Sequence, residues 1–226
     1  MPVVSVSPPP EPSDQLIVLR RLSWDVYERI NDQLGEGRNP RLIFCDGRLT
    51  IVVTSRRHDW FAERLGQLVV ALAEAMKMLW EDAGQATFRR REMNAGLEGD
   101  KTFYLGENAR LMKGPRNIDL TLQPPPDLAI EVEVSHSADA AMEAWGRLGV
   151  FEVWRFDPIS DEFQFWLRQD DGSYSPATRS AAFPALSASN VVEQMRWASE
   201  LGASAWHIQL RDWVSKLADR PLDQSE

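Results

Sequence analysis

The stretch that decides the fold is residues 127–134, Asp-Leu-Ala-Ile-Glu-Val-Glu-Val, where acidic and apolar residues alternate. Successive side chains of a strand point to opposite faces of its sheet, so the pattern predicts a strand with one apolar face. The other face carries Glu131 and Glu133, two like charges that repel each other when they are close and desolvated. Exposure to water relieves this repulsion, and so does a bound divalent cation. The stretch alone leaves both explanations open.

The residues that follow predict a crossover connection. A helix is expected at 138–148, where Gly149 ends it, and a strand at 151–156. A strand, a helix and a second strand form a parallel unit that its helix covers. Further strands are expected at 86–92, 101–105, 161–167 and near Tyr174, and a hairpin at 41–53 around Asp46-Gly47. The predicted fold class is α/β (α+β mixed), with a mixed central sheet flanked by helices.

The remaining helices are read from apolar periodicity and stop signals. The longest is expected at 58–82, with Gly84 as its stop. A shorter helix is expected from Trp24, with Ser23 as its N-cap. Residues 188–217 are expected to be helical with a break near Gly202, and residues 96–99 to form a turn.

Composition limits the classes of protein that the chain can be. It has 226 residues, nine tryptophans, three histidines and a single cysteine, so a disulfide or a multi-cysteine zinc site is excluded. No apolar run is long enough to span a membrane, and the N-terminus lacks a signal-peptide pattern. We expect a cytoplasmic protein with a proline-rich, disordered tail at 1–17 and a single domain at 18–220. The net charge of −9 argues against broad nucleic-acid binding but leaves room for a local basic patch.

Two acids mark a candidate metal site. Asp100 follows the expected turn and precedes a strand, and Glu131 lies in the middle of the acidic strand. An acid at a strand start and an acid on a neighbouring strand form the metal-binding arrangement of a large nuclease superfamily. Mg²⁺ prefers oxygen ligands, often one or two carboxylates, and lowers the pKa of its bound water.

Four segments carry a resemblance to a known family: residues 96–104 (GLEGDKTFY), 117–121 (NIDLT), 124–132 (PPPDLAIEV) and 148–155 (LGVFEVWR). Together they resemble the Uma-two family of restriction-endonuclease-like proteins, in the PD-(D/E)XK nuclease superfamily. The similarity covers roughly residues 20–215. The resemblance implies a restriction-endonuclease-like core with the site at one sheet edge. It also implies that Asp100 and Glu131 are the metal ligands, that Mg²⁺ or Mn²⁺ is the cofactor and that DNA is the substrate.

The chain departs from the family pattern at three positions. Gly99 stands where a proline usually precedes the first acid. Glu133 stands where the superfamily has its lysine, and Ala141 stands where family members carry a lysine on the following helix. That lysine orients the attacking water and stabilises charge on the phosphate. Lys101, or one of Arg89, Arg90 and Arg91, could replace this lysine. In a strand, however, the side chains of Lys101 and Asp100 would point to opposite faces.

Several other residues could act at the site or have a simpler structural role. The arginine run 89–91 is either a solvated strand end or the basic patch that contacts DNA backbone. His58 is a capping-region residue or a substrate contact, and Glu133 is expected to tune the site without binding the metal. Simpler roles are favoured for the rest: a solvated helix face for Glu63, an exposed loop for His136, strand entry for Asp127, and the core for Trp145, Trp154 and Cys45.

The leading hypothesis is therefore a Mg²⁺-dependent DNA endonuclease with catalytic residues Asp100, Glu131, Glu133 and Lys101, and with substrate contacts from Arg89, Arg90, Arg91 and His58. The alternative is a catalytically inactive nuclease fold that serves as a binding or assembly module. A third reading is a metal-binding accessory protein that does not act on nucleic acid. Because many proteins of such folds dimerise, a homodimer is open as well. A lysine or arginine within about 5 Å of the acids would favour retained catalysis.

Overall fold

The strands form two sheets, and the larger of them is the mixed central sheet that the sequence predicts. The structure, a computed structural model, describes residues 14–35, 39–114, 118–134 and 138–218. The smaller sheet is antiparallel and has five strands in the order β1 (Gln15–Arg20), β3 (Arg48–Val53), β2 (Arg41–Cys45), β6 (Ala95–Glu98) and β5 (Thr87–Arg90).

The larger sheet is mixed, as predicted. Its six strands run in the order β11 (Tyr174–Ala177), β10 (Glu162–Arg168), β9 (Glu152–Asp157), β8 (Leu128–Val132), β7 (Lys101–Leu105) and β4 (Trp80–Gly84). Strands β8 and β9 are parallel and the other neighbouring pairs are antiparallel. Helix α4 (Asp139–Leu148) joins β8 to β9, so the predicted crossover is confirmed.

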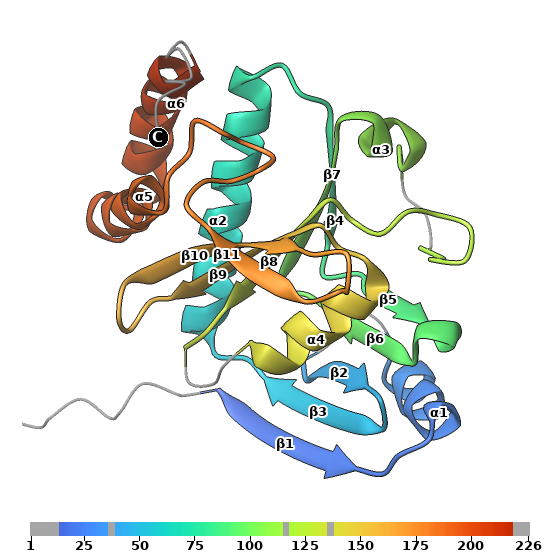
Figure 1. Cartoon of the computed structure of the whole chain (residues 1–226). Coiled ribbons are helices and arrows are strands. Elements are labelled where there is room, and N and C mark those ends of the chain that lie inside the picture. The colour runs from blue at the N-terminus through green and yellow to red at the C-terminus, as the bar shows by residue number, and fades with distance from the viewer. Residues whose placement is uncertain (1–13, 36–38, 115–117, 135–137, 219–226) are drawn as a thin grey trace, which may run out of the picture.

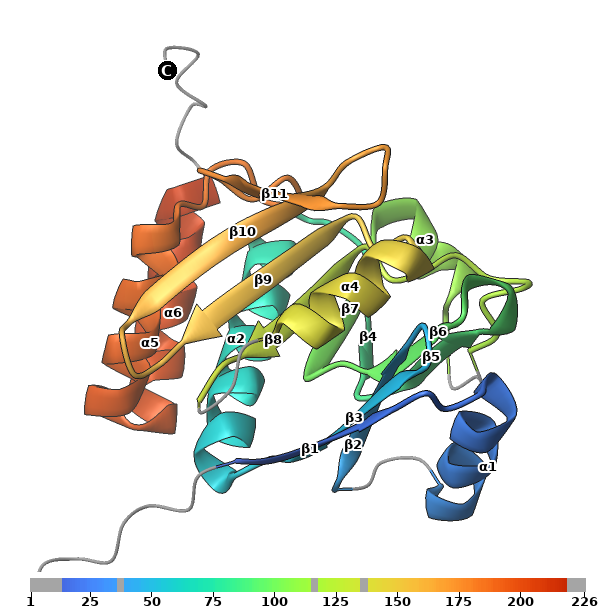
Figure 2. The same cartoon turned by 60° about the horizontal axis from the view of Figure 1, so that its bottom comes forward.

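The helices sort into layers (Figures 1 and 2). Helices α2 (Arg56–Ala75), α5 (Ala188–Leu201) and α6 (Ala203–Ala218) cover one face of the larger sheet. Helix α4 covers the opposite face and also packs against β2 and β6 of the smaller sheet. Helix α1 (Trp24–Leu34) packs on the other side of the smaller sheet, and α3 (Gly106–Leu111) follows β7. A short 3-10 turn, η1, spans Arg91–Met93.

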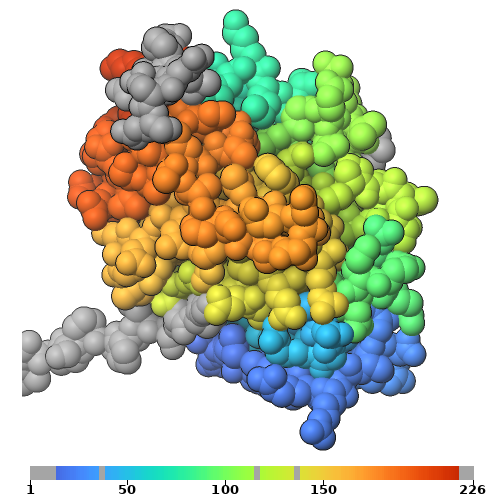
Figure 3. All heavy atoms as spheres, viewed as in Figure 1, coloured from blue at the N-terminus to red at the C-terminus, as the bar shows by residue number. Residues whose placement is uncertain are grey.

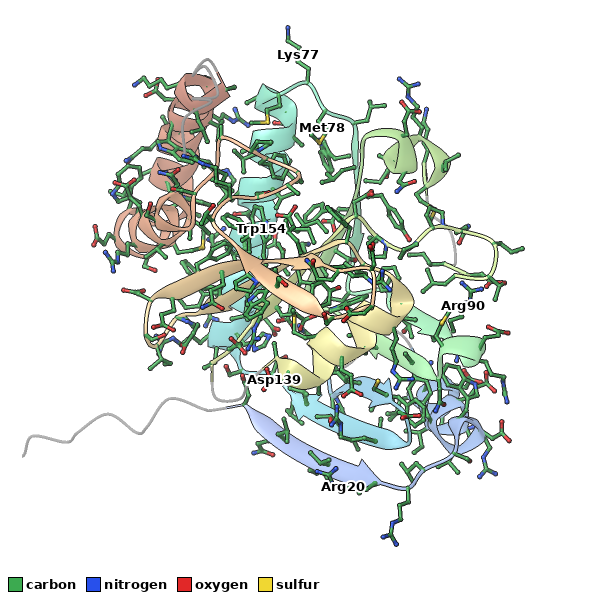
Figure 4. The ribbon with its side chains drawn as sticks, in the orientation of Figure 1. Arg20, Lys77, Met78, Arg90, Asp139 and Trp154 are labelled. Atoms are coloured by element: carbon green, nitrogen blue, oxygen red, sulfur yellow. The ribbon has the colours of Figure 1, made fainter. Side chains whose placement is uncertain are left out.

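The alternation of strand β8 divides its side chains between two cores. Leu128, Ile130 and Val132 join the core beneath α2, α5 and α6, whereas Ala129 packs on the α4 side. Trp154 lies near the centre of the molecule (Figure 4), and Trp145 is also fully buried, which confirms both as core residues. The side chain at position 131 therefore points to the same side as Ala129. On that side it is enclosed by α4 and by the smaller sheet.

Several predicted elements are confirmed. Helix α1 begins at Trp24 after Ser23, strands β2 and β3 form the hairpin around Asp46-Gly47, and β9 pairs with β10. The C-terminal helices are separated at Gly202. No helix within the described ranges is both long and apolar enough to cross a bilayer.

Helix α2 is shorter than predicted. It ends at Ala75, where Lys77 adopts a left-handed conformation with φ of 55° and projects outward (Figure 4). The Met78 amide donates a hydrogen bond to the Ala73 carbonyl, which reverses the chain. Residues 80–82, predicted to be helical, belong to strand β4, which pairs with β7. The apolar residues after Ala75 match a helical period by coincidence.

The predicted turn at residues 96–99 is instead largely the buried strand β6, so this prediction is wrong. Gly96 is required by a close approach, because a Cβ atom there would lie 2.4 Å from the Tyr27 hydroxyl oxygen. Strand β1 begins at Gln15, within the stretch 1–17 that the sequence predicts to be a tail. Residues 1–13, Asn117 and His136 lie outside the described residues.

Candidate functional site

Asp100 and Glu131 lie side by side on the face of the larger sheet that α4 covers. Strands β7 and β8 pair Lys101 with Ile130, and this antiparallel register places the preceding Asp100 beside Glu131. Both side chains are buried, with exposed fractions of 4% for Asp100 and 6% for Glu131. The structure thus brings together the two acids that the sequence selects.

Both carboxylate oxygens of Asp100 are engaged by other groups of the chain. The Arg41 guanidinium forms an ion pair with Oδ1. Oδ2 lies 2.8 Å from His58 Nε2 and accepts a hydrogen bond of 2.7 Å from the Val132 amide. Asp100 therefore joins three elements: β2 of the smaller sheet, helix α2 and strand β8.

Arg41 is the cation closest to this acid pair that the described residues show. It heads strand β2, is only 4% exposed, and also contacts Asp59 Oδ1 at 2.9 Å. Burial lowers the pKa of Arg41, while the negative charges of Asp59 and Glu131 raise it. A guanidinium keeps its proton even in such surroundings, so Arg41 supplies a fixed positive charge beside Asp100.

His58 links Asp100 to a second carboxylate. Its Nδ1 atom lies 3.1 Å from Asp14 Oδ2, and Asp14 Oδ1 accepts a 2.6 Å hydrogen bond from the Ser55 amide. Burial raises the pKa of Asp14, but the hydrogen bonds from His58 and Ser55 outweigh it and leave that pKa at about 2. Burial lowers the pKa of His58, and Asp14 opposes this effect. An imidazolium ring donates to both carboxylates, whereas a neutral ring donates to only one.

Glu131 is held by the indole of Trp145. The Trp145 Nε1–H group donates a 2.7 Å hydrogen bond to Glu131 Oε1 from helix α4. Burial raises the pKa of Glu131 to about 7, while this hydrogen bond and Arg41 lower it. Gly99 makes the contact possible, because a Cβ atom at this position would lie 2.7 Å from Trp145 Cζ2. The departure from the family proline therefore has a steric reason.

Glu133, at the usual lysine position, is neutralised by Arg155. The Arg155 Nη2 atom lies 2.6 Å from Glu133 Oε1, and the register of β8 and β9 places Arg155 beside Glu131. The repulsion between Glu131 and Glu133 is thus relieved by neighbouring arginines and an indole, and not by exposure of Glu131 to water. Ala141 is buried in α4, one helical turn before Trp145, and offers no charge.

Lys101 lies on the other face of the larger sheet. Its Nζ atom is 3.2 Å from Glu63 Oε2 and 3.1 Å from Asp82 Oδ2. The side chain also packs over Gly66 of α2, where a Cβ atom would be 2.8 Å from Lys101 Cε. The alternation of side chains along a strand predicts that Lys101 points away from Asp100, as observed. Neither Lys101 nor Glu63 is brought to the Asp100–Glu131 pair.

The arginine run is likewise separated from the acids. Arg89 contacts Asp32 at 2.9 Å, and Arg91 contacts Asp25 and Glu28 of α1, each at 2.7 Å. Arg90 lies at the outer edge of β5 (Figure 4), 3.5 Å from Glu92. Arg89 of β5 and Arg91 of η1 link these elements to α1, and the charge of all three arginines is balanced by nearby acids.

Two acids near the motif have local structural contacts, and those of Asp127 agree with its predicted role at the strand entry. Asp127 accepts hydrogen bonds from the Leu105 amide and the Asn108 side chain. Asp119 accepts from the amide and the hydroxyl of Thr121. Cys45 is buried, as predicted, and burial raises the pKa of its thiol to about 12.

The carboxylates of Asp100 and Glu131 are chemically suited to bind a hard divalent cation, but in this structure they are engaged by other groups of the chain. Two adjacent carboxylates are suitable oxygen ligands for Mg²⁺. Within the described ranges, however, no three His, Cys, Asp or Glu side chains gather into a metal-binding cluster. A metal ion on Asp100 would have to displace the Arg41 guanidinium from Oδ1.

Sequence reasoning missed Arg41 and Asp14. Arg41 begins a strand whose five residues are all buried, and a charged residue in such an apolar run is a sign of a buried ion pair. Asp14 had no comparable signal, because it precedes the first described strand and follows a proline-rich stretch.

The mixed sheet, its crossover helix and the acid pair define a restriction-endonuclease-like protein. The chain belongs to the Uma2 (Uma-two) family, described as "Putative restriction endonuclease", whose pattern matches residues 24–200. A crystal structure of a "putative nuclease belonging to DUF820" from Anabaena variabilis is similar, with a TM-score of 0.55 and 11% sequence identity. The similarity covers 76% of this chain and 98% of that one. No curated protein matches the sequence.

Proposed function

We propose that this protein is a Mg²⁺- or Mn²⁺-dependent DNA endonuclease, a cytoplasmic enzyme that hydrolyses phosphodiester bonds at the Asp100–Glu131 pair. The observation that carries the proposal is the adjacency of these two buried acids with Arg41 in direct contact with Asp100. This arrangement supplies the two carboxylates and one cation of a nuclease site, although the cation comes from β2 instead of the usual lysine positions.

Each group has a defined role in the proposal. A bound divalent ion lowers the pKa of its water and stabilises negative charge on phosphorus. Asp100 and Glu131 would hold that ion, and the Arg41 guanidinium would bind a phosphate oxygen of the substrate. His58, supported by Asp14, keeps Asp100 oriented through its Nε2 contact. Glu133 acts indirectly, by holding Arg155 beside Glu131.

The first test is cleavage of supercoiled plasmid with Mg²⁺ or Mn²⁺. We expect the wild-type protein to nick the DNA, and Asp100→Asn and Glu131→Gln to reduce the rate by about 100-fold or more, since each removes a ligand that stabilises the transition state. Asp119→Asn is the matched control, because Asp119 is an acid of the exposed loop. Equal background nicking by the wild type and all three variants would refute the proposal that the protein is an endonuclease.

A second measurement separates metal binding from turnover. Calorimetric titration with Mn²⁺ should give binding heat for the wild type, and much weaker binding for Glu131→Gln. The alternative function is an inactive nuclease fold that binds other molecules, and the full engagement of Asp100 by Arg41, His58 and Val132 favours it. Absence of both cleavage and Mn²⁺ binding would support that alternative.

A further inference from the structure

One carboxylate oxygen of the acid pair differs from the other three. Both oxygens of Asp100 contact donors of the chain, and Glu131 Oε1 accepts the 2.7 Å hydrogen bond from Trp145 Nε1. For Glu131 Oε2, by contrast, the described part of the chain shows no hydrogen bond and no ion pair. Because each carboxylate oxygen has two lone pairs that can accept, Oε2 is the oxygen of the acid pair that is most open to a ligand.

The indole of Trp145 has a fixed position on α4. Its ring is fully buried, and its centroid lies 5.4 Å from the centroid of the Phe88 ring at an interplanar angle of 61°. In Figure 3, the band of yellow atoms that includes α4 lies between the orange atoms around β11 and the blue atoms of the smaller sheet. A close-packed side chain keeps one rotamer, so the Nε1–H group of Trp145 points in one direction and orients the Glu131 carboxylate.

Gly99, which precedes Asp100, leaves the room that this indole needs. A Cβ atom at position 99 would lie 2.7 Å from Trp145 Cζ2 and 3.4 Å from Glu131 Oε1. The φ angle of Gly99 is outside the left-handed region, so the glycine is required by space and not by backbone conformation. The orientation of Glu131 therefore depends on two residues from other elements, Gly99 and Trp145.

We propose that Trp145 is a positioning residue of the metal site and selects the oxygen with which Glu131 binds the cation. Its indole N–H group engages Oε1, and Oε2 is the oxygen that takes the divalent ion. This inference rests on the proposed function, because it requires that a cation binds at Asp100 and Glu131. Hydrogen bonds that orient a metal ligand commonly contribute about 10- to 100-fold to metal affinity.

The same hydrogen bond gives the site a preference among cations. Mg²⁺ requires nearly ideal octahedral geometry, whereas Ca²⁺ accepts more ligands and can take both oxygens of one carboxylate. Mn²⁺ shares the octahedral oxygen coordination of Mg²⁺. Because Trp145 engages Oε1, Glu131 is better suited to Mg²⁺ and Mn²⁺ than to Ca²⁺.

Trp154 provides a matched control on the other face of the larger sheet. It is also fully buried, and its Nε1–H group donates a 2.7 Å hydrogen bond to Glu152 Oε1. The second oxygen of Glu152 accepts a 2.8 Å hydrogen bond from the Ala182 amide. Trp154→Phe therefore removes the same kind of ring and the same kind of hydrogen bond as Trp145→Phe, but away from the acid pair.

The first test compares the binding of Mn²⁺ and Ca²⁺ by calorimetry. We expect Trp145→Phe to weaken Mn²⁺ binding by about 10-fold or more and Ca²⁺ binding by a smaller factor, and Trp154→Phe to leave both unchanged. Thermal unfolding followed by circular dichroism checks that both variants are folded. Unchanged Mn²⁺ binding by Trp145→Phe overturns the proposal. An equal loss in both variants overturns it as well, because that result would show a general effect of core packing.

The indole signal of Trp145 gives a readout that does not depend on cleavage. In ¹H–¹⁵N spectra this signal is the one that Trp145→Phe removes. We expect Glu131→Gln and added Mg²⁺ each to shift it, while the Trp154 signal stays in place. A Trp145 signal that Glu131→Gln does not move overturns the proposal.

A second replacement keeps the test valid if Trp145→Phe does not fold. Benzothienylalanine at position 145, in which sulfur takes the place of the N–H group, keeps the shape of the ring and removes the donor, so it serves in both experiments. The binding data also separate the two levels of the argument. A wild type that binds no Mn²⁺ overturns the proposed function together with this inference, whereas Mn²⁺ binding that survives loss of the N–H group overturns the positioning role alone.

Discussion

Arg41 and Asp100 form a buried ion pair that joins the two sheets of the molecule. The guanidinium comes from the first residue of β2, and the carboxylate comes from the residue before β7. Nuclease folds of this class require a positive charge next to their acids, and this chain provides it from a different part of the fold. The pair is therefore both a structural contact and the centre of the proposed chemistry.

Removal of Arg41 should destabilise the protein strongly. Arg41→Met leaves Asp100 buried without its cation, which costs about 3 to 5 kcal/mol in comparable cases. Urea unfolding at neutral pH measures the loss. The control Arg48→Met breaks the exposed pair with Glu143 and should cost at most about 1 kcal/mol. The double variant Arg41→Met/Asp100→Asn should be more stable than Arg41→Met alone, because it removes the orphaned charge. A double variant as unstable as the sum of both changes would contradict this account.

Restoration of the family lysine should increase cleavage. Ala141→Lys places an ammonium group on α4 one turn before Trp145, where family members carry it, and a well-placed cation is worth about 10- to 1000-fold in rate. Plasmid nicking rates with Mn²⁺ measure the gain. Ala140→Lys adds the same charge to the neighbouring position and serves as the control. An equal gain for both variants would indicate a general electrostatic effect on DNA binding.

Lys101 should be dispensable for chemistry. Because its side chain points to the α2 face, between Glu63 and Asp82, Lys101→Met should change the nicking rate by less than about two-fold, within the range of uncoupled sites. The same assay is used, with Asp100→Asn as the inactive reference. A loss comparable to that of Asp100→Asn would show that Lys101 reaches the acids during turnover.

The contribution of Asp14 to stability should depend on pH. Its pKa in the folded protein, about 2, is below its usual value of 3.8, so its stabilising effect is complete above pH 4 and is lost as the pH falls toward 2. A shift of this size corresponds to about 2 kcal/mol. Comparison of unfolding curves for the wild type and Asp14→Asn should show a large difference at pH 6 and a much smaller one at pH 2.5. A constant difference would mean that Asp14 acts through packing alone.

The sequence predicted those parts of the molecule in which a local residue pattern is compatible with only one structure. The alternation at 127–134, the Asp46-Gly47 hairpin and the break at Gly202 are of this kind, and so is the adjacency of Asp100 and Glu131. Gly96 and Gly99 were misread as a turn because the partners that require glycine, Tyr27 and Trp145, are distant in sequence. Arg41 and Asp14 could not be connected to Asp100 because their contacts arise only when the smaller sheet packs beside α2 and α4.

The position of Asp14 has a practical consequence for anyone who shortens this protein. The family pattern begins at residue 24, and a chain trimmed to that limit would lose β1 together with the acceptor of His58 Nδ1. His58 would then face Asp100 without its second carboxylate, and β3 would become the new open edge of its sheet. A trimmed protein that fails to cleave would therefore report on the loss of Asp14 and strand β1, and not on the native molecule.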